Sequence, residues 1–413
     1  VLASGLSRGG FVELSSADEL RHADLSKVRG AFSLLLDPKN ITVGTVAQAS
    51  GWSYAAIIGA GYSGNAGLDV NESLFSEGSS FNTDGETLSE LSLALSADAK
   101  RLALGLPSDN GYNGTSTASG AVRLFSFTDG SFGGCALEST IGRGYTGGKN
   151  VALSAGQAST NYRFGYSVAL SSDARTLAVG VPGDLGSGVP QASYGAVRLF
   201  KFSDDRFSSV SQQFVVGKGY SGAGSLNLGA FLDADNFGSS VSLALNGRLL
   251  AVGAPGDSGA GNGIGGMGAA HLFSFSDDAF GGASHEAVVG VAYSSHPSFL
   301  LKGKNLDITG WGSTDAFGTS VAMSEDGRML AIGAPGDDSP WDYSSSYYDS
   351  GAAYLFSFGG DNFSSGVWQG VLGLGYGWGK SVSINAAANH RFGSALSFSR
   401  DGKVLGVGSP GAG

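Results

Sequence analysis

The chain has 413 residues, of which 70 are glycine, and its 24 basic and 35 acidic side chains give a formal net charge of −11. Charged residues make up only 14% and hydrophobic residues 42%, so the chain is turn-rich but has enough apolar surface to fold, which excludes disorder. The few basic residues form no run, which excludes nucleic acid and anionic lipid surfaces as partners. The single cysteine, Cys135, excludes an intramolecular disulfide and a thiolate metal cluster.

Neither an apolar run of about 18 residues nor a basic stretch followed by an apolar one occurs, so we expect no transmembrane segment and no signal peptide. The first residue is Val1 rather than methionine, which is typical of a processed or excised chain.

In chain order, one unit recurs, and its N-terminal copies are the weakest. Residues 28–60 hold a degenerate copy, and better copies follow at about 61–140, 141–215, 216–288, 289–371 and 372–413, which makes six. Gly10-Phe-Val-Glu-Leu14 reads like the later segment Gly120-Ala-Val-Arg-Leu124, so residues 1–27 could complete the last copy. We therefore treat residues 1–413 as a single repeat domain.

The first element of the unit is clearest from Phe164 to Asp184, and it recurs at 237–257, 317–337 and 392–411. Its Ser-Val-Ala-Leu-Ser segment alternates with period two, which predicts a strand. Asp326-Gly327 is typical of a tight hairpin, because a positive φ is easily adopted there. Pro255 and Pro335 mark where the second strand ends, because proline donates no ladder hydrogen bond.

The second element is Gly195–Phe202, which recurs at 120–127, 268–275 and 351–358 and again alternates with period two. A third segment carries a Gly-Tyr pair, such as Gly219-Tyr220, before a short apolar stretch. No stretch sustains a period of 3.6 residues, so we expect almost no helix. The sequence predicts an all-β fold of tandem four-stranded antiparallel sheets.

Phe-Gly-x-Ser-Val-Ala, Val-Gly-Ala-Pro-Gly and Gly-Ala-Val-x-Leu-Phe resemble the FG-GAP repeat of integrin-α-type β-propellers and of bacterial surface exoproteins. The resemblance covers residues 28–413 and implies a β-propeller. The six copies would make it six-bladed, with an open β-repeat array or fibre as the alternative. That family's Asp-x-Asp-x-Asp-Gly calcium loop is replaced here by Ser-x-Asp-Gly-Arg, so calcium at this hairpin is not implied. Leu34 to Thr42 also looks like a segment of filamentous-haemagglutinin-like bacterial exoproteins.

Acids that follow Pro-Gly are the metal candidates. Asp184, Asp257, Asp337 and Asp338 lie at the same end of successive second strands, and clustered hard oxygens could take calcium as the one cofactor. The alternative is structural, because aspartate favours such turns through hydrogen bonds to its own backbone.

Aromatic residues are the ligand-binding candidates. Trp341, Tyr343, Tyr347 and Tyr348 crowd one variable loop, where they could stack on sugar rings or anchor a protein, or equally pack beneath their own loop. Trp311 and Trp378 lie in the third segment. Asn-x-Ser/Thr sites for glycosylation occur at Asn40, Asn71, Asn113 and Asn362.

Catalytic chemistry has little support in the sequence. The five histidines occupy unrelated repeat positions, and no serine lies in a nucleophile elbow between strand and helix. We expect a secreted, extracellular or cell-surface protein of structural or adhesive type, without enzymatic activity. Its loops would bind a matrix glycan, a protein or another copy of the chain in a filament. The alternative is a polysaccharide-acting propeller lyase or glycosidase, which needs convergent carboxylates.

Overall fold

The computed structural model describes residues 91–411 apart from 115, 131, 154–159, 189–192, 262–264, 297–300, 309–314 and 339–347, together with four N-terminal strands. The fold is all-β, as the sequence predicts. Within the described residues the helical elements are three-residue 3-10 turns at 112–114, 229–231 and 245–247.

One repeat folds into one sheet, and residues 167–227, here called sheet 2, show the pattern. Four strands form an antiparallel meander, and a short fifth strand pairs in parallel with the fourth. The predicted sheet had four strands; the fifth is the apolar stretch after the Gly-Tyr pair. The strands are β10 (Ser167–Leu170), β11 (Thr176–Val181), β12 (Ala196–Phe202), β13 (Val210–Gly217) and β14 (Ser225–Asn227).

Three further sheets repeat this order of five strands. Sheet 1 (residues 92–153) contains β5 (Ser92–Leu95), β6 (Arg101–Leu106), β7 (Ala121–Ser126), β8 (Ala136–Arg143) and β9 (Val151–Leu153). Sheet 3 (residues 240–307) contains β15 (Ser240–Ala244), β16 (Leu249–Ala254), β17 (Ala269–Ser274), β18 (Ser284–Gly290) and β19 (Leu306–Asp307). Sheet 4 (residues 320–383) contains β20 (Ser320–Met323), β21 (Met329–Ala334), β22 (Ala352–Ser357), β23 (Val367–Gly373) and β24 (Val382–Ser383).

The two ends of the chain form two-stranded sheets. Sheet 5 pairs β25 (Ala395–Phe398) with β26 (Leu405–Gly408) in antiparallel order. At the N-terminus β1 (Gly10–Ser16) pairs in parallel with β2 (Ala31–Pro38), and β3 (Ile57–Gly59) pairs in parallel with β4 (Gly67–Asp69). Thus β1 hydrogen-bonds to β2, and the expectation that residues 1–27 complete the last copy stays a prediction.

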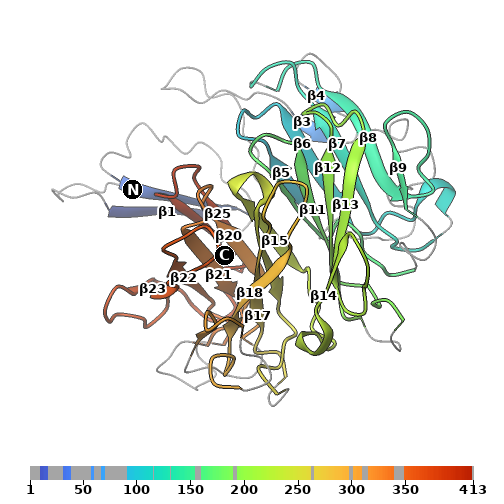
Figure 1. Cartoon of the computed structure of the whole chain (residues 1–413). Helices are drawn as coiled ribbons and strands as arrows, with labels where there is room; N and C mark the ends of the chain where they lie inside the picture. The colour runs from blue at the N-terminus through green and yellow to red at the C-terminus, as the bar shows by residue number, and fades with distance from the viewer. Residues whose placement is uncertain are drawn as a thin grey trace, which may run out of the picture.

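The sheets are arranged as blades of a β-propeller. The first strands β5, β10, β15, β20 and β25 lie beside one another in succession, and the other strands of each sheet extend outward (Figure 1). The Gly-Tyr segment closes the preceding sheet, because its short strand pairs with that sheet's fourth strand. The predicted repeat boundaries placed the same segment at the start of the next unit.

Apolar side chains fill the space between neighbouring sheets. Val197 and Leu199 of β12 pack against Leu250 and Val252 of β16, and all four are fully buried. The second strands β6, β11 and β16 are buried along their whole length, as expected for a strand covered on both faces. Burial between sheets is therefore what holds successive repeats together.

The Phe-Gly and Val-Gly pairs form the closest contact between sheets. Gly180 of β11 lies directly against the carbonyl group of Gly238 in the next repeat, and a Cβ at Gly180 would overlap that oxygen. The Ser167 hydroxyl donates to the same oxygen at 2.9 Å, and the preceding Phe237 is fully buried. The other equivalent glycine pairs are 105/165, 253/318 and 333/393. Glycine is therefore required on the inner strand, because any side chain would push the sheets apart.

This contact predicts that Gly180→Ala destabilises the fold by roughly 3 kcal/mol or prevents folding, because overpacking against backbone cannot be relieved by a rotamer change. Gly377→Ala is the matched control, since a Cβ at Gly377 meets no atom within 4 Å. Urea unfolding followed by circular dichroism measures both. Equal stability of the two variants would contradict the tight contact.

Candidate functional site

In the turns between first and second strands, the side-chain and backbone groups of each turn hydrogen-bond to one another. In sheet 2 the Ser171 hydroxyl donates to Asp173 at 2.7 Å, and Asp173 also accepts from the backbone N–H of Arg175 at 3.0 Å. The N–H of Thr176 donates back to the Ser171 hydroxyl at 2.9 Å. The same bonds recur in the turns at 96–101, 324–329 and 399–404. The serine hydroxyl therefore satisfies the aspartate that a calcium loop would present to a metal.

These turns meet at one face of the propeller, where side chains connect three repeats. The Ser172 hydroxyl contacts Asn246 of sheet 3 at 2.8 Å and donates to Glu325 of sheet 4. The backbone N–H of Leu245 donates to the Glu325 carbonyl at 3.0 Å. The turns thus form a continuous polar surface around the first strands.

A pocket of about 660 Å³ opens between the turns of sheets 3, 4 and 5, and we call it the hairpin-face pocket. Its lining combines two guanidinium groups with four carboxylates, besides one apolar side chain and one amide. The lining residues are Leu245, Asn246, Arg248, Asp278, Glu325, Asp326, Arg400 and Asp401.

The carboxylates of this pocket have hydrogen-bond or ion-pair partners, whereas its two arginines have none among the described residues. Asp326 accepts from the Ser324 hydroxyl at 2.6 Å, Asp278 pairs with Lys201 of sheet 2 at 2.6 Å, and Glu325 accepts from Ser172. Arg248 and Arg400 are exposed, and neither guanidinium has a hydrogen bond or ion pair with the described residues. The pocket therefore offers unused hydrogen-bond donors of positive charge.

The acids that directly follow Pro-Gly lie on the opposite side of the sheets, and Asp184, Asp257 and Asp337 are buried. Asp184 is 1% exposed and accepts from the hydroxyl of Tyr220, the tyrosine of the Gly-Tyr pair, at 2.8 Å. It also accepts from Tyr162 at 2.6 Å and lies 3.7 Å from the Arg198 guanidinium. Its other oxygen accepts from the N–H of Gly186 at 2.7 Å. Asp184 therefore anchors a turn within a closed polar cluster.

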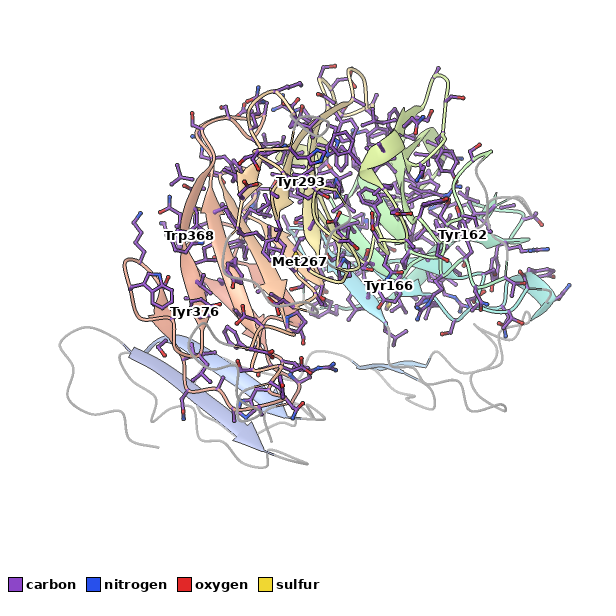
Figure 2. The ribbon with its side chains drawn as sticks, turned by 90° about the horizontal axis from the view of Figure 1, so that it is seen from below. Tyr162, Tyr166, Met267, Tyr293, Trp368 and Tyr376 are labelled. Atoms are coloured by element: carbon purple, nitrogen blue, oxygen red, sulfur yellow. The ribbon has the colours of Figure 1, made fainter. Side chains whose placement is uncertain are left out.

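The same aspartate–tyrosine bond recurs once in each complete sheet. The pairs are Asp109–Tyr145 at 3.0 Å, Asp257–Tyr293 at 2.7 Å and Asp337–Tyr376 at 2.8 Å. Of these tyrosines, Figure 2 labels Tyr293 and Tyr376, each in the segment that follows the fourth strand of its sheet. Asp338 is half-buried and accepts from the N–H of Asp349 at 2.9 Å. The predicted calcium ligands are thus spread over three sheets, with Asp337 and Asp338 in the same turn, and in the described part of the chain no three acids or histidines gather as a metal site.

Among these buried aspartates, Asp257 has a pKa well above the ordinary value of a carboxyl group. Burial raises its pKa to about 7, and the nearby Asp235 carboxylate adds to the effect, although hydrogen bonds from Tyr293 and Gly259 favour the ionised form. Burial also raises the pKa of Asp235. This pair replaces the aspartate–tyrosine–arginine cluster of sheet 2, where Tyr162 stands at the position of Asp235.

The remaining groups of interest are unsuited to catalysis. His271 is fully buried, burial lowers its pKa to about 3, and its Nδ1 lies 3.2 Å from Nε2 of His285. Burial also lowers the pKa of His285, so both rings stay neutral near pH 7. Burial raises the pKa of the Cys135 thiol to about 11, which keeps it protonated and a weak nucleophile.

The aromatic candidates are only partly within the described residues. Trp311, Trp341, Tyr343 and Tyr347 lie outside them, whereas Tyr348 is exposed. Trp378 is exposed and its ring lies 5.5 Å from that of Tyr376. The sequence reasoning did not single out Trp368, which is exposed on β23 at the outer side of sheet 4 (Figure 2).

Of the glycosylation candidates, Asn113 and Asn362 are exposed in turns, and Asn40 and Asn71 lie outside the described residues. The sequence reasoning also missed the hairpin-face pocket. A partial signal was present, because the residue after the Asp-Gly position of each hairpin turn is basic and is Arg248 in sheet 3, whereas Arg400 precedes its Asp-Gly pair.

The Asp257 cluster predicts a pH dependence of stability. A folded pKa of about 7 exceeds the unfolded value of about 3.9, so the folded state binds the proton more tightly. The stabilising contribution of this proton is complete below about pH 4 and is lost as the pH rises to about 7. The free energy of unfolding therefore falls by about 3–4 kcal/mol between these two pH values. Asp257→Asn mimics the neutral form and should remove the effect. Urea unfolding of both proteins at several pH values measures this, and parallel pH profiles would contradict it.

The closed hairpin turns predict that a calcium chelator leaves the melting temperature unchanged, because their carboxylates are satisfied by serine and backbone donors. By contrast, Asp173→Ala should destabilise the protein by about 1–2 kcal/mol, because two hydrogen bonds are lost. Calorimetry with calcium and with chelator tests the first point. A melting temperature that drops on chelation would show that the chain holds calcium elsewhere.

Comparison with known proteins identifies one segment. Residues 311–356, which include the first three strands of sheet 4 except the end of β22, match a family model described as the FG-GAP repeat. No curated protein matches the chain. Among solved structures, the periplasmic gluconolactonase PpgL of Pseudomonas aeruginosa matches with 14% identity and a TM-score of 0.39. The match covers 78% of this chain and 66% of the gluconolactonase chain, so this chain spans somewhat less than two thirds of the gluconolactonase's length.

Within the described residues, no helix has the length and apolar character needed to cross a membrane. The sheets and the family match together describe an all-β repeat protein of propeller type with an FG-GAP repeat at residues 311–356.

Proposed function

We propose that this FG-GAP repeat protein is an extracellular, non-catalytic binding protein of structural or adhesive type, and that its hairpin-face pocket holds an acidic glycan. The observation that carries the proposal is the pair Arg248 and Arg400, which line one pocket and whose guanidinium groups have no partner among the described residues. Uronate carboxylates are suitable acceptors, because guanidinium groups bind carboxylates in a fork geometry.

The pocket's acids support specificity for a sugar over a simple anion. Glu325 and Asp401 lie in the same lining as the arginines, and carboxylates accept hydrogen bonds from sugar hydroxyls. An acidic glycan offers both hydroxyl donors and carboxylate acceptors. Extracellular placement fits a chain with a single half-buried cysteine and no basic surface run.

Titration calorimetry with oligogalacturonate tests this proposal, with a neutral glucan oligomer of equal length as the control ligand. Arg248→Ala combined with Arg400→Ala should weaken binding at least about tenfold, which corresponds to about 1.4 kcal/mol. Arg206→Ala is the matched control, because Arg206 is exposed but does not line the pocket. Equal binding of the acidic and neutral oligomers, or no effect of the double variant, would overturn the proposal.

One observation favours a second function, a polysaccharide-cleaving enzyme. Glu325, Asp326 and Asp401 line the same pocket, and paired carboxylates carry acid–base chemistry in glycosidases. Release of reducing or unsaturated ends from acidic glycans, abolished by Glu325→Gln, would favour the enzyme. Binding of the glycan without any cleavage would favour the non-catalytic binding protein over the enzyme.

A further inference from the structure

Two histidines meet in the contact between sheets 2 and 3, which we call the seam. His271 of β17 and His285 of β18 lie on neighbouring strands, and their rings stack with centroids 5.2 Å apart. Nδ1 of His271 lies 3.2 Å from Nε2 of His285, a hydrogen bond in which one ring donates and the other accepts. His271 is fully buried, whereas His285 is half-buried. The pair therefore extends from the solvent-accessible edge of the seam into its interior.

Phenylalanine rings enclose this pair. The edge of Phe237 packs against His271 at 5.4 Å, and the edge of Phe231 packs against His285 at 4.8 Å. Phe273 of β17 stacks on His285 at 4.7 Å. Phe231 and Phe237 both belong to residues 228–239, which connect sheet 2 to sheet 3 and which we call the linker. The two imidazole rings therefore hold the linker against sheet 3.

The interior end of the pair has no acceptor for an additional proton. Nε2 of His271 is buried and has no hydrogen-bond partner among the described residues. A neutral ring tolerates this position when Nε2 is the unprotonated nitrogen, because Nδ1–H then donates to His285. A protonated ring carries a second N–H, which would be buried without an acceptor at a high cost in free energy. The geometry therefore suits the neutral pair.

The cations around the pair oppose its protonation. Burial lowers the pKa of His285, and the charges of His271 and Lys302 lower it further. Glu286, the neighbour of His285 in the chain, is held by Lys302 at 2.7 Å and by Lys304. Lys218 of sheet 2 donates to a carbonyl of the linker. A proton on either histidine would thus join a positively charged environment.

The acids of the seam do not compensate for such a proton. Burial raises the pKa of Asp235 in the linker and that of Asp257 after β16, so both lose negative charge as the pH falls. Asp233, the other acid of the linker, is exposed. Across the seam, Asp278 is paired with Lys201 of β12 at 2.6 Å. Acidification therefore removes negative charge from the seam while it favours positive charge on the rings.

The other complete sheets have no titrating ring at these two positions. His271 lies opposite the residue that precedes the inner glycine, and the corresponding residues of sheets 1, 2 and 4 are Arg123, Arg198 and Tyr354. His285 lies opposite the third-strand phenylalanine, and the corresponding residues are Leu137, Gln213 and Trp368. None of these side-chain types changes its charge between about pH 4 and pH 7. A titrating pair at these positions is therefore confined to sheet 3 among the four complete sheets.

We propose that the His271–His285 pair is an acid-sensitive lock, which holds the linker against sheet 3 near neutral pH and opens the seam between sheets 2 and 3 when it takes up a proton. The proton enters at His285, which reaches solvent, and passes to His271 along the bond between the rings. The positive charge then lies among phenylalanine rings and beside Lys302, so the linker is released. This inference does not depend on the proposed glycan binding.

The direction of the effect follows from proton linkage. Burial lowers the pKa of His271 to about 3, whereas an unfolded histidine has a pKa of about 6.5, so the open seam binds protons more tightly. The closed seam is therefore fully favoured above about pH 6.5 and loses this advantage as the pH falls. At about pH 4.5 one ring makes opening roughly a hundredfold more favourable than at about pH 7. Asp257 acts in the opposite direction, because its raised pKa stabilises the closed state in acid.

Hydrogen exchange in the unmodified chain and in His271→Phe with His285→Leu tests the proposal. Tyr354 shows that a six-membered ring fits the first position, and Leu137 holds the second position in sheet 1. Asp257 is present in both proteins, so its contribution cancels in the comparison. The protection factors of β16, β17 and β18 should fall between about pH 7 and pH 4.5 by at least about tenfold more in the unmodified chain than in the variant. Those of β21 and β22 in sheet 4 should change equally in both.

His390→Gln is the matched control, because it removes a histidine of the segment before β25, outside the seam. This control should keep the acid response of the unmodified chain. A difference of less than about tenfold between the unmodified chain and the double variant would overturn the proposal. An equal loss of protection in sheets 3 and 4 of the unmodified chain would also overturn it. His285→Leu alone replaces the double variant if the latter does not fold, since it removes the ring through which the proton enters.

Discussion

The close approach of glycine backbone between neighbouring sheets is the constraint on which the structure depends. Gly180 touches the carbonyl of Gly238, and the Ser167 hydroxyl bonds to the same oxygen, so two repeats are locked at their inner strands. Once that contact is set, the apolar faces of Val197 and Leu250 can meet at van der Waals distance. The high glycine content is thus a packing requirement as well as a turn requirement.

Polar groups buried by this packing are satisfied within each repeat. A buried carboxylate such as Asp184 would be costly without donors, and Tyr220, Tyr162 and Gly186 supply them. The sheet 3 version substitutes Asp235 for Tyr162, which leaves two neighbouring carboxyl groups and a raised pKa at Asp257. The repeat therefore tolerates variation in this cluster as long as the central aspartate keeps its tyrosine.

The two sides of the propeller differ in how their charged groups are satisfied. The aspartate–tyrosine clusters at one end of the second strands are buried and hold the turns, whereas the hairpin turns at the other end leave charged side chains exposed. Neighbouring turns contact one another through Ser172 and Glu325, so a pocket can be assembled from residues of three repeats. A rigid scaffold that positions variable polar residues is well suited to recognition.

The sequence by itself determined the all-β class, the repeat, the hairpin turns and the end of each second strand. These are local properties, because period-two alternation, Asp-Gly and proline act within a few residues. Only the tertiary structure decided that the Gly-Tyr segment belongs to the preceding sheet, that Asp257 is buried rather than open to a metal, and that Arg248 and Arg400 share a pocket. Those facts depend on contacts between residues far apart in the chain, which a repeat pattern leaves undetermined.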